Sequence, residues 1–148
     1  MAYEIKYRLS RILFGLVIFL MGLKGAFDYT NSSNLLKANI KDFNSDEGLS
    51  KLILSENYGE FINYWLKQCL NFTVLSENAD ELVIILQLSL VLGGLMCILG
   101  YSISKFFIIS SIIVDLIFIH NLRFFATDSS KGLMLKYIVF IGGSLHIA

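Results

Sequence analysis

Long apolar stretches follow one another along this chain, separated by short polar connections and by one long polar region. Each stretch approaches the roughly 20 apolar residues that an α-helix needs to cross a bilayer. The pattern predicts an all-α, integral membrane protein with one domain, a four-helix antiparallel bundle. The first stretch also fits a signal peptide, although Lys24 and Asp28 crowd the cleavage site. The predicted spans cover about 9–27, 82–100, 106–122 and 132–148.

The polar region, residues 28–81, carries nine of the twelve acidic residues. Within it, apolar side chains recur at helical spacing with polar ones opposite, which predicts an amphipathic helix over about 58–71 in the membrane interface. A shorter helix is expected near 36–43, and Ser76 is expected to cap the second span. The apolar face of the interfacial helix is formed by Phe61, Ile62, Trp65 and Leu66.

Composition agrees with a membrane setting and excludes several functions. Hydrophobic residues make up 55% of the chain and charged residues 16%, and the mean hydropathy is +0.67. Twelve basic residues balance twelve acidic ones, so no nucleic-acid partner is expected. Cys69 and Cys97 lie too far apart in predicted depth to pair and are expected to be buried thiols. No catalytic motif and no metal-ligand spacing is found, and the chain is not expected to be an enzyme.

Small residues in the spans predict where helices pack closely. Gly15 and Gly22 are seven residues apart and therefore share one helix face, while Ser89, Gly93 and Cys97 recur every fourth residue. The glycines expected to mediate helix packing are Gly15, Gly22, Gly93, Gly142 and Gly143.

Asp115 is the sharpest candidate, because it lies about 14 Å into the third span and so near the bilayer midplane. A structural pairing, a contact with a partner subunit and a proton or ligand role all stay open. Ser111 is its expected neighbour, and Asn121 is a further candidate for a polar or partner contact. His120 and Lys136 lie at similar depth near an interface, where they form a candidate quinone or lipid site; a satisfied interfacial histidine is the alternative.

Three segments carry a family resemblance: RILFGLVIFLMGLKGAF at 11–27, the stretch 90–125 with His120-Asn121 before aromatic residues, and LKYIVFIGGSLHIA at 135–148. They resemble the DoxX-like family of small four-helix membrane proteins, whose wider clan includes the Surfeit-locus cargo receptors. The resemblance implies a fold rather than one function, since the family includes oxidoreductase-associated subunits, chaperone-like proteins and receptors. The chain departs from it in a loop of more than fifty residues, no tryptophan after His120, and an end directly after the fourth helix.

These observations favour a non-catalytic accessory subunit of a larger membrane complex, with other membrane subunits and lipids as partners. The favoured setting is a respiratory-chain complex of the mitochondrial inner membrane, where an amphipathic cap suits docking. One alternative is a quinone-binding component of an oxidoreductase, with His120 and Lys136 on the ring oxygens. Another is a secretory-pathway cargo receptor or chaperone of the ER membrane, which glycosylation at Asn71 would favour. No cofactor is expected, and a bound lipid or quinone is the alternative.

Overall fold

A computed structural model describes residues 2–43, 64, 68–69, 71–119 and 128–147. Regular secondary structure in this part of the chain is helical throughout, as predicted. The described elements are α1 (Ala2–Phe27), α2 (Tyr29–Phe43), α4 (Phe72–Glu77), α5 (Ala79–Leu99), α6 (Ser104–Val114), the π-helix η2 (Asp115–Ile119) and α7 (Asp128–His146).

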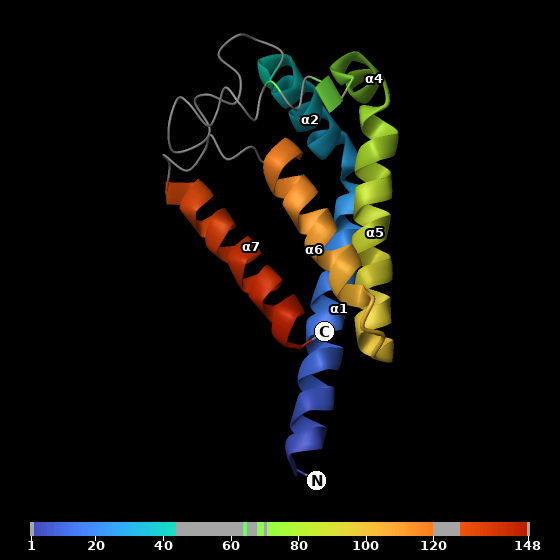
Figure 1. Ribbon diagram of the computed structural model, residues 1–148, viewed down its shortest axis with the longest axis vertical. Coiled ribbons are helices and arrows are strands. Elements are labelled where there is room, and N and C mark those ends of the chain that lie inside the picture. Colours follow the sequence, from blue (N-terminus) through green and yellow to red (C-terminus); the bar gives the residue numbers. More distant parts are fainter. Residues whose placement is uncertain (1, 44–63, 65–67, 70, 120–127, 148) are drawn as a thin grey trace.

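The long helices alternate in direction. In Figure 1, α1 runs upward from the N-terminus, α5 returns downward beside it, α6 runs upward and α7 downward. The reversal between α5 and α6 is tight because Gly100 adopts a left-handed conformation, with φ of 88°, and its backbone N–H caps the last turn of α5. The short helices α2 and α4 lie together at the opposite end, against α5 and η2.

Glycines bring α1 and α5 into close contact. A methyl group at Gly94 would lie 2.5 Å from the backbone nitrogen of Phe19 and 2.7 Å from the carbonyl oxygen of Gly15. Gly22, seven residues after Gly15, also faces α5. A methyl group at Gly22 would lie 2.8 Å from the backbone nitrogen of Val91. Backbone atoms cannot move aside as a flexible side chain can, so this crossing needs glycine. The expectation that Gly15 and Gly22 share a packing face is met.

The other predicted packing glycines differ in what they face. Gly93 lies against Ile108 of α6, and Gly143 lies against the ring of Phe14 on α1. Gly142 is expected to pack, but no described residue lies within 4 Å of the position a methyl group would take there. The reason is rotational: α7 turns Tyr137 and Ser144 inward, which leaves Gly142 on its exposed face.

Polarity is distributed in the opposite way from a water-soluble bundle. Large apolar side chains cover the outside of the long helices, including Leu13 at 54% exposure, Ile85 at 62% and Phe106 at 69%. The described interior holds two apolar clusters and seven polar side chains. Exposed leucines are common in any protein, but so many large apolar side chains on the outside of the long helices are compatible with a membrane setting. The buried polar side chains are Ser33, Asn39, Gln87, Ser104, Ser111, Asp115 and Ser144.

Among the described residues, two helices are long and apolar enough to cross a membrane: α1, over Tyr3–Phe27, and α5, over Ala79–Leu99. α6 is apolar but shorter, and α7 does not meet the same length and composition criterion. The all-helical prediction is thus confirmed, whereas four membrane-crossing helices are not.

The polar region differs from its prediction in several details. α2 follows α1 almost directly and extends over Tyr29–Phe43, further than the expected helix near 36–43. Ser76 lies inside α4 rather than at a cap; Asn71 caps that helix by accepting hydrogen bonds from two backbone N–H groups. Cys69 is exposed, so the expectation of two buried thiols is wrong for it and met for Cys97. The predicted interfacial residues Phe61, Ile62, Trp65 and Leu66 lie outside the described residues.

Candidate functional site

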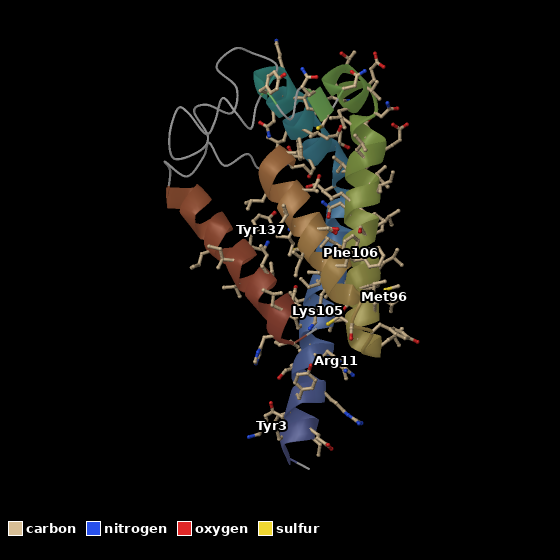
Figure 2. All side chains as sticks on the ribbon, in the orientation of Figure 1. Tyr3, Arg11, Met96, Lys105, Phe106 and Tyr137 are labelled. Atoms are coloured by element: carbon tan, nitrogen blue, oxygen red, sulfur yellow. The ribbon has the colours of Figure 1, made fainter. Side chains whose placement is uncertain are left out.

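A buried polar contact joins the third and fourth long helices. The hydroxyl group of Tyr137, on α7, donates a hydrogen bond to a carboxylate oxygen of Asp115. Both side chains are almost fully enclosed, with 6% of Asp115 and 5% of Tyr137 exposed, and Tyr137 points from α7 toward α6 (Figure 2). This contact supports the first explanation for Asp115, a structural pairing, because a buried carboxyl group needs a hydrogen-bond donor.

Asp115 also marks a change in helix geometry. The α-helical hydrogen bonding of α6 ends at Val114, and η2 continues from Asp115 with the wider π pattern. Asn39 of α2, only 5% exposed, donates from its amide to the carbonyl oxygens of Phe118 at 2.9 Å and Ile119 at 2.7 Å. These carbonyls end the π-helix, where a helix leaves acceptors without partners of its own. Asn39 thus stabilises the wider turn, a geometry that is frequent at functional sites.

A pocket of about 310 Å³ lies beside η2, between α5 and α6 and beneath α2 and α4. Its upper wall is apolar and includes Leu36, Ile40 and Leu75. Ser89, Ser110 and Ser111 supply hydroxyl groups in the middle of the helices. The volume is at the lower limit of known small-molecule sites, which makes this pocket the best-formed candidate for binding.

Ser111 lines this pocket, with its hydroxyl group enclosed. The side chain is 2% exposed, yet its Oγ has no hydrogen-bond partner within the described structure. Ser110 behaves differently, because its Oγ donates back to the carbonyl oxygen of Phe106 at 2.6 Å. Ser111 is the expected neighbour of Asp115, one turn away on the same helix, but among the described residues its Oγ does not hydrogen-bond to that carboxyl group, whereas Tyr137 does.

The proposed quinone or lipid pair is only half described. His120 and Asn121 lie outside the described residues. Lys136 is exposed on α7, and its ammonium group lies 5.7 Å from the ring centroid of Phe140. This distance is within the range of a cation–π interaction.

Charged side chains gather at the two ends of the bundle. At the α2 end, Ser33 donates a hydrogen bond to Asp80, and Lys37 lies 3.3 Å from the same carboxylate. At the opposite end, the guanidinium of Arg11 lies against Gly100, at the level where α5 ends and α6 begins (Figure 2). A cation at this position interacts favourably with the carbonyl groups at the C-terminal end of α5.

Sequence reasoning missed Asn39 and Tyr137. Asn39 had a signal, since it falls beside Ile40 on the apolar side of an amphipathic helix, where an amide is unexpected. Tyr137 had no such signal. Tyrosines of membrane helices are commonly found at the membrane–water interface, so the sequence gives no reason to expect a hydrogen bond in the interior. Within the described residues, no group of three His, Cys, Asp or Glu side chains is placed to hold a metal ion.

Comparison of the chain with protein-family models, with curated proteins and with solved structures gave no match. The likeness to DoxX-like proteins therefore stays a sequence-based expectation.

Proposed function

We propose that this chain is a multi-pass membrane protein that acts as a non-catalytic accessory subunit of a larger membrane complex. The observation that carries the proposal is the outer face of α7, where Lys136 is exposed among large apolar side chains. The apolar outside and polar inside of the bundle support the membrane setting.

Lys136 is poorly placed for a residue facing lipid. It lies about 12 Å from the start of α7 and about 15 Å from its end, at the rise of an α-helix. A lysine at the centre of a membrane helix is unfavourable by about 2.5–3.5 kcal/mol unless it reaches water or a partner. Its ammonium group lies over Phe140, one turn toward the C-terminal end of α7, and at the rise of an α-helix that level is still about 9 Å from the end.

The surroundings of Lys136 fit a second helix. Leu135, Ile138 and Val139 are 64%, 52% and 61% exposed, and Gly142 has open space in front of it. A glycine on an exposed membrane helix lets a neighbouring backbone approach closely. A partner helix that brings a carboxylate to Lys136 would neutralise the charge and cover this face.

The test is gentle solubilisation of the native complex, native electrophoresis and mass spectrometry of the co-migrating proteins. We expect the wild-type chain and Lys136→Arg to migrate within a large complex, and Lys136→Met to be released from it. The matched control is Lys6→Met, at an exposed position near the start of α1 that should not affect assembly. A wild-type chain that migrates alone, or Lys136→Met that stays assembled, would falsify the proposal.

The co-migrating proteins also decide among the specific settings. Respiratory-chain subunits would place the chain in the mitochondrial inner membrane, as the sequence favours, and an oxidoreductase would favour the quinone alternative. Secretory clients, together with glycosylation at Asn71, would favour the cargo-receptor alternative.

A further inference from the structure

The pocket between α5 and α6 opens sideways. Ile85 and Val114 line it and are themselves 62% and 41% exposed, so they stand at its mouth. Both belong to the apolar outer surface of the long helices. If that surface faces lipid, the pocket is reached from within the membrane, and its ligand must dissolve there.

The deeper part of the pocket is polar enough to select among such molecules. Ser89 is the central residue of α5, and Ser111 lies about 10 Å along α6, so both hydroxyls are well removed from the helix ends. The Oγ of Ser111 is enclosed and has no partner in the described structure, so a change of its χ1 rotamer is needed to present the hydroxyl group to the pocket that the residue lines. Leaving a buried hydroxyl group unpaired is unfavourable, and a ligand with a hydrogen-bonding group would offset that loss.

The lining also limits the charge of the ligand. No charged residue is among the described side chains that form the pocket. A phosphate or carboxylate group placed at the depth of Ser111 would be desolvated without a compensating cation. An uncharged hydroxyl or carbonyl group meets no such barrier.

We infer that this pocket binds a neutral membrane amphiphile: one apolar chain lying along Leu36, Ile40 and Phe118, with an uncharged hydroxyl or carbonyl group at Ser111. The inference goes beyond assembly into a complex and rests only on the membrane setting of the proposed function. Binding is therefore measured on the purified protein, where the loss of partner subunits has no effect.

The experiment uses a photoreactive long-chain alcohol, with a diazirine in mid-chain, on the purified chain in lipid nanodiscs. We expect saturable labelling that peptide mapping places on pocket residues and that unlabelled alcohol displaces, whereas phosphatidylcholine does not. Ile85→Trp fills the mouth and should reduce labelling to the unsaturable background. Leu92→Trp is the matched control, because it is seven residues further on the same exposed face of α5 but does not line the pocket.

Ser111→Ala tests whether the protein recognises the polar group of the ligand or whether the apolar chain of the ligand alone fills the pocket. Loss of one hydrogen bond should lower the preference for the alcohol over its hydrocarbon analogue about fivefold. If Ser111 instead bonds back to its own helix, as Ser110 does, that preference will not change and the assignment of the polar group is overturned. Labelling that is unsaturable, that Ile85→Trp leaves intact, or that phosphatidylcholine displaces equally overturns the binding site itself. None of these outcomes depends on whether the chain assembles with partner subunits through Lys136.

Discussion

Gly94 is the residue at which the fold leaves least freedom, because backbone atoms of α1 occupy the place of its missing side chain. Gly94→Ala should therefore push α1 away from α5 and lower the free energy of unfolding by about 1–3 kcal/mol. The measurement is unfolding of the purified protein by SDS in mixed micelles, followed by circular dichroism. Gly142→Ala is the control, since it has open space and should stay within about 0.5 kcal/mol of wild type. Equal losses for the two variants would show that the α1–α5 contact is not as described.

Tyr137 is the residue on which the burial of Asp115 depends. Tyr137→Phe keeps the ring but removes the donor, so a buried carboxyl group loses a partner and unfolding should become easier by about 1–3 kcal/mol. Tyr101→Phe loses the same hydroxyl at a position that is 60% exposed, and should change little. The same SDS titration compares them. Indistinguishable midpoints would mean that the hydroxyl of Tyr137 does not stabilise the bundle.

At the scale of elements, the π-helix depends on a residue from another helix. Asn39→Ala leaves the carbonyls of Phe118 and Ile119 without the Asn39 donor, and Asn39→Asp also places an acceptor against them. Hydrogen exchange in residues 115–119 should become about tenfold faster in either variant, which corresponds to roughly 1.4 kcal/mol of lost local stability. Asn34→Ala, at an exposed position of the same α2, is the control and should exchange like wild type. Unchanged exchange in Asn39→Ala would show that η2 holds its geometry without α2.

The elements themselves were predictable to different degrees. Hydrophobic periodicity found α1 and α5, because a long apolar run depends only on local sequence. It could not find η2, since the π turn is stabilised by Asn39, about eighty residues away, and such a contact leaves no local pattern. The membrane span is predicted from 82 and its N-cap at Ser76; α5 begins between them, at Ala79, with Asp80 and Glu81 in its first turn.

At the scale of the whole molecule, composition predicted the apolar exterior better than the site. Many large apolar residues lie on the exterior, and Gln87, Ser111, Asp115 and Ser144 are buried, whereas Lys24 and Lys136 are exposed. Glycine spacing showed that helices pack closely, but not which ones: Gly94 faces α1, while the neighbouring Gly93 faces α6. A pocket formed by α2, α4, α5, α6 and η2 exists only in the folded protein, so no local pattern in the sequence predicts it.

The same distribution predicts that α1 stays with the rest of the protein instead of being removed as a signal peptide. α1 packs on α5 at Gly15, Gly22 and Gly25, where the side chain of Gln87 lies against Gly25. Removing α1 would break its close contact with α5. Gln87 and the small-residue face of α5 would then be exposed to lipid. A chain tagged at both ends should therefore remain in the membrane pellet after alkaline carbonate extraction, with both tags on one polypeptide. Recovery in the supernatant would contradict the membrane setting, and loss of the N-terminal tag alone would contradict only the retention of α1.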